Sequence, residues 1–213
     1  DGEESGINPH GGDGTGIVSN VSNLLLNHSF RSLSHWTGAA CNCGDTCITN
    51  YENQAYAHYG KKVLRLQSNR AENEGNGVYQ DTIALPSGEY TFSAYVRVLY
   101  GGFTGSGRPG VYIRVSKTDG TVLSESERLS RYDSEYVRLI APFALETGMS
   151  VRVEILMDGK GTAYADAAQL EKNGYANSYN MLTNGNFERN TTEWNVSGGV
   201  YAVSGTRFNM SRS

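Results

Sequence analysis

The sequence is poor in several residue types and patterns, and each shortage argues against a class of protein. Its 213 residues include four prolines, four histidines, three cysteines and two tryptophans. No apolar run approaches the roughly 18 residues that a membrane-spanning helix needs. No signal peptide is present at the front, so any export signal is expected upstream. Strong helix formers never make a long stripe with a period of about 3.6 residues, which argues against a helical protein.

Positive charge is also scarce and scattered. The formal net charge is −4, and Lys and Arg do not cluster. Nucleic acids and anionic membranes both attract clustered positive charge. The sequence therefore predicts no nucleic acid as the main partner and no membrane insertion.

Catalytic motifs are missing as well. The sequence contains no H-E-x-x-H motif, no G-x-S-x-G elbow and no P-loop. The stretch "GSGRPG" at residues 105–110 fits G-x-G-x-x-G, but it leads into a strand pattern, whereas a dinucleotide-binding loop opens a helix. The sequence predicts a protein that is not an enzyme. A pair of carboxylates placed for glycoside hydrolysis is the alternative that the sequence leaves open.

One passage occurs twice. "NLLLNHSFRSLSHW" (23–36) and "NMLTNGNFERNTTEW" (180–194) share the order Asn, two apolar residues, one more residue, Asn, two residues, Phe, a polar run, Trp. The two copies are about one domain length apart. We therefore expect a Gly-rich linker at 1–17, a complete module at 18–174, and a linker with the truncated start of a second copy at 175–213. Neighbouring modules of the same chain are expected partners.

Alternation with a period of two is the pattern that is present. In "EYTFSAYVRVL" (89–99) and "VYIRVSK" (111–117), every second residue is apolar, which is typical of strands with one face in a core. Asp119-Gly120 predicts a hairpin turn after the second of these strands, and Asp158-Gly159 marks another turn. Further strands are expected at 63–67, 78–85, 136–143, 151–157 and 162–170. About eight or nine short, regularly spaced strands predict an all-β fold, a two-sheet antiparallel β-sandwich of jelly-roll type.

Three passages in this order carry a resemblance to a known family. The opening "NLLLNHSF", the middle "GVYQDTIALPSGEYTFSAYVRV" and the closing "AYADAAQLEKNGYANSYN" resemble bacterial carbohydrate-binding modules of the cellulase and xylanase, CenC-like type, which are galactose-binding-like jelly rolls. The chain is still more similar to the tandem modules among YD (Rhs-type) repeats in cell-wall-associated proteins of Gram-positive bacteria. The resemblance implies a secreted or wall-displayed module that binds a polysaccharide or cell-surface glycan. The alternative is a structural spacer or adhesion unit that keeps the jelly roll without a sugar site.

The candidate ligand residues are those that alternate with the core-facing residues of two strands. They are Tyr95 and Arg97 on one strand and Tyr112 and Arg114 on the next, with Gln80 as a possible addition. If these strands are neighbours, they form a polar and aromatic strip on a concave sheet face, where tyrosine rings stack on sugar rings. The alternative is that they are ordinary residues of a solvated strand face.

Trp36, Trp194 and Asp166 are open to a structural and a functional interpretation. For the two tryptophans we favour packing in the core or under loops over a ligand platform. The resemblance implies a structural calcium ion held partly by Asp166, although the second acidic position of the family's closing pair is Ala167 here, and Arg31 stands where the repeat copy has Glu188. The alternative role for Asp166 is to cap a loop by hydrogen bonds.

All three cysteines lie in "CNCGDTC" (41–47). The spacing does not fit a paired C-x₂-C zinc site. A local disulfide of Cys47 with Cys41 or Cys43 is favoured over free thiols or a metal, and the sequence does not fix the connectivity.

Overall fold

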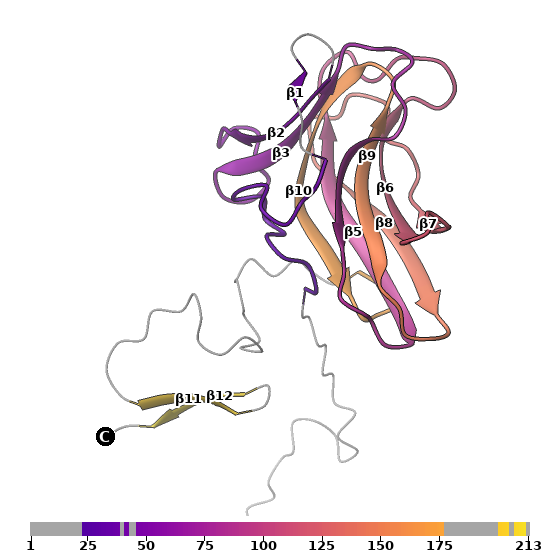
Figure 1. The fold of residues 1–213 in the computed structure, drawn as a ribbon. Coiled ribbons are helices and arrows are strands. Elements are labelled where there is room, and N and C mark those ends of the chain that lie inside the picture. Colours follow the sequence, from indigo (N-terminus) through magenta and orange to yellow (C-terminus); the bar gives the residue numbers. More distant parts are fainter. Residues whose placement is uncertain (1–22, 39–40, 43–45, 177–199, 205–206, 212–213) are drawn as a thin grey trace, which may run out of the picture. The chain divides into compact units, whose positions relative to one another are not determined.

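A computed structural model describes residues 23–38, 41–42, 46–176, 200–204 and 207–211, with backbone alone for 41–42 and for the last two ranges. Within these residues the chain is all-β and has no helix (Figure 1). None of its described elements is therefore a helix long and apolar enough to span a membrane. The described residues between 23 and 176 belong to one compact unit, which contains strands β1 to β10.

Two antiparallel sheets make up this unit. The six-stranded sheet has the order β1-β2-β3-β10-β5-β8, and the four-stranded sheet has the order β4-β9-β6-β7. The strands of the first sheet are β1 (Cys41–Asn42), β2 (Thr46–Glu52), β3 (Lys62–Ser68), β10 (Gly161–Glu171), β5 (Gly88–Val98) and β8 (Val137–Leu145). Those of the second are β4 (Asn76–Asp81), β9 (Val151–Asp158), β6 (Gly110–Lys117) and β7 (Val122–Glu125). The predicted jelly-roll sandwich is confirmed.

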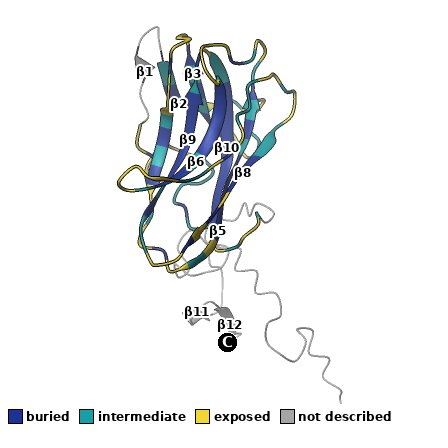
Figure 2. Ribbon diagram, turned by 90° about the vertical axis from the view of Figure 1, so that its right-hand side faces the viewer, coloured by how far each residue is buried: buried dark blue, intermediate teal, exposed yellow. Residues whose placement is uncertain are grey.

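The core lies between the two sheets and follows the alternation of the sequence. On β5, Phe92, Ala94 and Val96 are fully buried against the other sheet, and on β6 Ile113 and Val115 face them. The strand interiors are buried and the connecting turns are exposed (Figure 2). Burying one face of each sheet in this way is what a period-two pattern achieves.

The opening segment is attached to the last strand of the sandwich. The Asn23 side chain donates to the carbonyl of Ala168 at 2.8 Å and accepts from the amide of Leu170 at 3.0 Å. The amide of Leu24 donates to the carbonyl of Leu170 at 2.9 Å. At this point β10 is irregular, because its register with β5 shifts and Ala167 adopts a positive φ of 51°. The first Asn of the repeated passage thus fastens the start of the module to its end.

The two aromatic residues Phe30 and Trp36 of the repeated passage have packing roles. Phe30 is fully buried, and its ring centroid lies 5.1 Å from that of Trp36. The indole Nε1 of Trp36 donates to the carbonyl of Asn27 at 3.2 Å. The packing role expected for Trp36 is confirmed. Trp194 lies outside the described residues.

Two strands of the sandwich, the short β1 and the longer β2, do not follow from hydrophobic alternation. β2 includes Cys47 and is paired along its whole length with β3, although this stretch reads as part of a polar, cysteine-rich loop. Cys47 is disulfide-bonded, so the local disulfide is confirmed for this residue. Cys41 is its register partner across the β1–β2 pair.

Of the segment predicted to start a second copy, the structure describes only a hairpin. β11 (Val200–Ser204) pairs with β12 (Arg207–Ser211) in a separate two-stranded sheet. The linker expected at 1–17 and most of the segment 175–213 lie outside the described residues, so these predicted boundaries stay predictions.

Candidate functional site

The two predicted Tyr-x-Arg pairs lie on different sheets. Tyr95 and Arg97 belong to β5 of the six-stranded sheet, whereas Tyr112 and Arg114 belong to β6 of the four-stranded sheet. Each pair points away from the core, so the pairs lie on opposite outer faces of the sandwich. The expectation that they form one strip was wrong. Alternation indicates which residues of a strand point outward, but the chain between β5 and β6 crosses from one sheet to the other.

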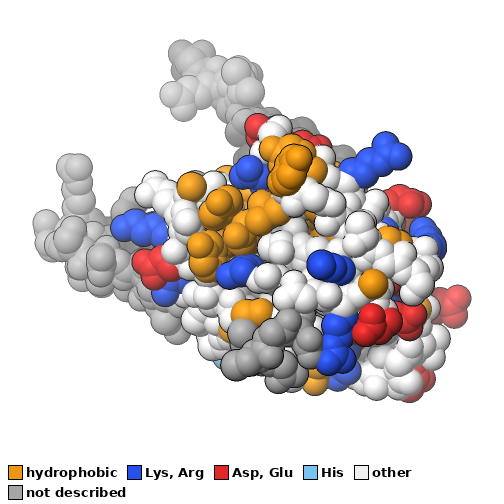
Figure 3. All heavy atoms as spheres, turned by 90° about the horizontal axis from the view of Figure 1, so that it is seen from above, with side chains coloured by type: hydrophobic (Ala, Val, Ile, Leu, Met, Phe, Trp, Pro, Cys, Tyr) orange, Lys and Arg blue, Asp and Glu red, His pale blue; other side chains and the backbone are white. Residues whose placement is uncertain are grey.

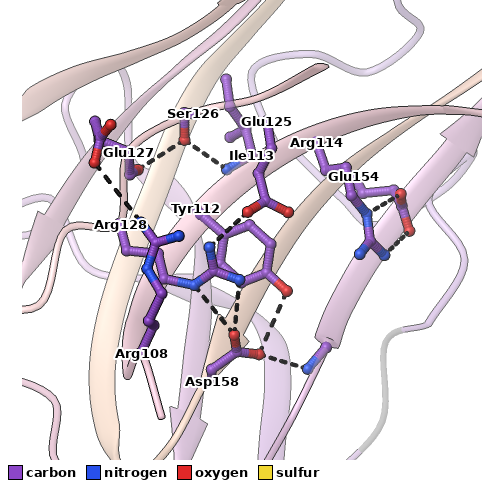
Figure 4. Close-up of polar contacts among 11 residues, drawn as sticks. Arg108, Tyr112, Ile113, Arg114, Glu125, Ser126, Glu127, Arg128, Glu154 and Asp158 are labelled. Atoms are coloured by element: carbon purple, nitrogen blue, oxygen red, sulfur yellow. Dashed lines mark hydrogen bonds and ion pairs between the residues drawn. The ribbon is translucent and has the colours of Figure 1, made fainter. Parts of the chain in front are cut away.

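Tyr112 is covered by its own neighbours. The guanidinium of Arg128 lies over its ring, 3.9 Å from the centroid, and its hydroxyl donates to Asp158 Oδ1 at 3.3 Å (Figure 4). Only 2% of the residue is exposed, and burial raises the pKa of its hydroxyl to about 12. Tyr112 is therefore not presented as a stacking platform for a sugar.

Arg114 is fully engaged in an ion pair beside Tyr112. Its Nε and Nη2 donate to the two carboxylate oxygens of Glu154 at 2.8 and 3.0 Å (Figure 4). The Ser116 hydroxyl donates to the same carboxylate at 3.0 Å. A bidentate pair of this kind occupies two of the guanidinium donors and neutralises its charge. This face of the four-stranded sheet is a closed polar network that holds strands together.

Gln80 belongs to neither outer face. It lies on the same side of β4 as the core residue Val78 and is 7% exposed. Its side-chain amide donates to the carbonyl of Leu26 at 3.0 Å and accepts from the amide of Leu26 at 2.8 Å. Its amide group therefore holds the opening segment in place and is not turned toward a ligand.

The outer face of the six-stranded sheet carries a group of aromatic rings that sequence reasoning did not assemble. Tyr51 of β2, Tyr56 of the β2–β3 loop and Tyr164 of β10 lie together. The Tyr164 ring is stacked with that of Tyr51 at a centroid distance of 5.8 Å and with that of Tyr56 at 4.9 Å. We call this surface, which also carries Tyr95, Arg65 and Arg97, the tyrosine face.

Arginines flank the central tyrosine of this face. Tyr164 is the register partner of Arg65 on β3 and of Arg97 on β5. Side chains of directly paired residues project from the same side of a sheet. The three side chains therefore form a row across β3, β10 and β5.

The two arginines of this row are incompletely hydrogen-bonded. The Nε atoms of Arg65 and Arg97 are both buried without a hydrogen-bond partner. Arg65 also donates from Nη2 to Gln67 Oε1. Among the described residues, the Arg97 guanidinium has no hydrogen-bond or ion-pair partner, so donors of this face are unused by the protein.

A second aromatic group lies beside the row. The His58 ring packs against Tyr95 at 4.4 Å and against Tyr136 at 4.7 Å between centroids. The Arg138 guanidinium lies 5.3 Å from the Tyr95 ring centroid. Burial lowers the pKa of His58, and Glu135 opposes this effect. Residues 53–60, the loop that carries His58, thus cover part of Tyr95.

Asp166 fixes this loop to the sheet. Its Oδ2 accepts from the backbone amides of His58 at 3.0 Å and Tyr59 at 2.9 Å, and its Oδ1 accepts from the amide of Ala167 at 2.7 Å. The Tyr136 hydroxyl donates to the carbonyl of Tyr56. Burial raises the pKa of Asp166 to about 6, against the opposing effect of the three amides.

The expected calcium role of Asp166 stays a prediction. Ca²⁺ takes six to eight oxygen ligands, and the hydrogen bonds found at this carboxylate come from backbone amides. In the part of the chain that the structure describes, no group of three or more His, Cys, Asp or Glu side chains is placed to hold a metal. The contacts match the alternative role of capping a loop.

Part of this site was within reach of the sequence. Tyr164 and Asp166 alternate with alanines in "AYADA", so their outward direction follows from the period-two pattern. Tyr51 and Tyr56 gave no such signal, because β2 was not predicted and Tyr56 lies in a loop.

The end of the sandwich seen in Figure 3 carries another group of hydrophobic side chains, tyrosine included, which lie among Lys and Arg side chains.

Comparisons with known proteins identify the fold of this chain but do not assign the chain to a family. No protein-family model matches the sequence. The tRNA nuclease WapA of Bacillus subtilis (strain 168) is 51% identical over 41 residues, which are 19% of this chain and 2% of that protein. The tRNA(Glu)-specific nuclease WapA of Bacillus subtilis subsp. natto matches to the same extent. The chain thus corresponds to a very small part of these relatives.

Several solved structures are similar to this chain over most of the sandwich. A putative sugar binding protein from Bacteroides thetaiotaomicron is 12% identical with a TM-score of 0.51, over 71% of this chain and 100% of that one. The CBM22-1-CBM22-2 tandem domain of Paenibacillus barcinonensis Xyn10C is 20% identical with a TM-score of 0.50, over 73% of this chain and 47% of that one. At this level of identity the similarity shows the fold, a jelly-roll β-sandwich of the kind found in carbohydrate-binding modules.

Proposed function

We propose that residues 23–176 form a non-catalytic carbohydrate-binding module that binds a glycan on the tyrosine face. The observation that supports this most is the stack of Tyr51, Tyr56 and Tyr164 beside Arg65 and Arg97 on one outer sheet face. Aromatic rings offer a broad apolar surface with a polar edge. Such a surface suits the apolar face of a sugar ring, and the nearby arginine donors suit its hydroxyl groups.

The setting we propose is a larger bacterial protein that is secreted or associated with the cell wall. The disulfide at Cys47 supports this setting, because disulfides persist mainly in oxidising compartments outside the cytosol. The repeated passage supports tandem copies of the module, as in YD (Rhs-type) repeat proteins. In such an array, binding at one copy raises the effective concentration of the glycan at the next, so weak sites together give a higher overall affinity.

One observation favours the alternative function, a structural spacer or adhesion unit. The loop 53–60 lies on the tyrosine face, and His58 packs directly on Tyr95. A face filled by the protein's own loop has less room for a ligand. The half-buried Tyr51 and Tyr56 are therefore the rings that decide between the two functions.

Calorimetric titration with xylohexaose, β-1,4-galactotriose and bacterial wall polysaccharides tests the proposal. Tyr51→Ala and Tyr56→Ala are each expected to weaken binding about tenfold, which corresponds to about 1.4 kcal/mol of lost stacking. Tyr100→Ala is the matched control, because Tyr100 is 92% exposed and lies outside the tyrosine face, in the segment after β5.

Three outcomes separate the functions. Binding that both face variants weaken and the control retains supports the carbohydrate-binding module. Binding that all three variants retain places the glycan elsewhere and contradicts the proposed site. Failure of the folded wild type to bind any of these glycans favours the spacer.

A further inference from the structure

The arginines of the tyrosine face differ from those of the opposite face in how they are paired. On the four-stranded sheet, Arg114 and Arg152 each hold a carboxylate through two hydrogen bonds, with Glu154 and Asp81 as partners. Among the described residues, Arg97 has no acidic partner, and Arg65 donates only to the neutral Gln67. The fold therefore pairs its outward arginines on one face and leaves two of them without carboxylates on the other.

The geometry brings these two cations to one place. Arg65 and Arg97 are both register partners of Tyr164, and neighbouring strands lie about 4.8 Å apart, so their Cα atoms are separated by roughly 10 Å. Both Nε atoms are buried and without acceptors. An unsatisfied buried donor is costly, and in a native protein it needs an explanation.

The acidic residue nearest in register to the two arginines already accepts hydrogen bonds from the backbone. Asp166, two positions after Tyr164 on β10, accepts from three backbone amides of the loop 53–60 and of β10 itself. Arg138, on the next row, donates to the neutral Ser93 at 3.0 Å and Gln169 at 3.3 Å. None of the carboxylates that the structure describes forms an ion pair with Arg65 or Arg97.

We propose that Arg65 and Arg97 make the tyrosine face selective for an anionic glycan, with a carboxylate or phosphate group of the ligand accepting from guanidinium Nη atoms that no carboxylate of the described residues occupies. The planar guanidinium matches both anions and binds them through paired hydrogen bonds. Tyr164 is only 4% exposed, so the half-buried Tyr51 and Tyr56 take the sugar ring while the arginines take its charge. This inference rests on the proposed function, since it names the class of glycan that the same site binds.

A pair of ligands that differ only in charge tests the inference. Polygalacturonate is compared with polygalacturonate whose carboxylates have been reduced to primary alcohols, by calorimetry with the intact chain at low and high salt. The anionic form is expected to bind at least about tenfold more tightly at low salt, and high salt should reduce that advantage. Poly(glycerol phosphate) forms a separate arm that tells a phosphate ligand from a carboxylate ligand.

Matched variants separate local recognition from overall charge. Arg97→Gln is expected to abolish most of the preference for the anionic form, and Arg97→Lys to retain part of it. Arg152→Gln removes the same charge from the opposite face and is expected to keep the preference. Urea unfolding of each variant checks that the fold is retained.

The outcomes distinguish this inference from the function on which it rests. Equal binding of the anionic and reduced polymers overturns the anionic preference and leaves the carbohydrate-binding function standing. An equal loss of preference in Arg97→Gln and Arg152→Gln also overturns it, because the effect is then one of net charge. Failure of the wild type to bind neutral and anionic polymers alike contradicts both proposals.

Discussion

Asp166 gives the sandwich a pH dependence whose sign follows from its burial. The carboxylate is completely buried, and its pKa rises from an ordinary 3.8 to about 6. A group whose pKa is higher in the folded state binds its proton more tightly there, so it stabilises the fold at low pH. That contribution is complete below pH 3.8 and is lost as the pH rises through about 6.

The size of the effect follows from the same two values. The pKa difference between 3.8 and about 6, at about 1.36 kcal/mol per pH unit, gives up to about 3 kcal/mol. Asp166→Asn removes the titration while keeping the shape of the side chain. The stability of the wild type minus that of Asp166→Asn should therefore increase by about 2 to 3 kcal/mol as the pH falls from 7 to 4.

Urea unfolding at several pH values measures this difference. His58 has a lowered pKa, so its own contribution is lost as the pH falls, in the opposite direction. It is present in both proteins and cancels from the comparison. A difference that stays flat between pH 4 and 7, or that shrinks on acidification, would refute the assignment of a raised pKa to a buried, loop-capping carboxylate.

Two further predictions concern stability. Glu154→Gln should lower the free energy of unfolding by about 2 kcal/mol, because it breaks the bidentate pair with the partly exposed Arg114. Glu52→Gln at the exposed pair with Lys62 should change it by less than about 0.5 kcal/mol. Urea unfolding of both variants checks this, and equal losses would contradict a special role for the Arg114–Glu154 pair. Gly77→Ala should cost about 3 kcal/mol, because a Cβ at Gly77 overlaps the Ile155 carbonyl oxygen and separates β4 from β9. Thermal unfolding close to that of the wild type would show that β4 adjusts without loss.

The sequence predicted the strands better than their arrangement. Period-two alternation placed β5, β6 and β9 because a buried sheet face demands it, and Asp119-Gly120 correctly marked the turn between β6 and β7. β2 was missed because it contains few strongly apolar residues and draws its order from pairing with β3 and from the Cys47 disulfide. The local sequence pattern indicates which side of a strand is buried. Which strands pair with one another depends on contacts between residues that are far apart in the sequence.

The candidate site shows the same limit. Tyr95 and Arg97 were placed correctly on an outward face, while Tyr112 and Arg114 were joined to them across a sheet boundary that alternation does not reveal. The Tyr51, Tyr56 and Tyr164 stack depends on three segments that meet only in the folded sandwich. Which tyrosines meet is therefore a property of topology, whereas the outward direction of each strand residue is a property of local sequence.

The bonds from Asn23 and Leu24 to the end of β10 bring the two ends of the sandwich side by side. The described part of the sandwich therefore begins beside its own last strand. In a protein that repeats a unit whose first and last segments are adjacent, each copy adds mass but adds little to the end-to-end length of the protein. Many copies then fit along a short length of such a protein.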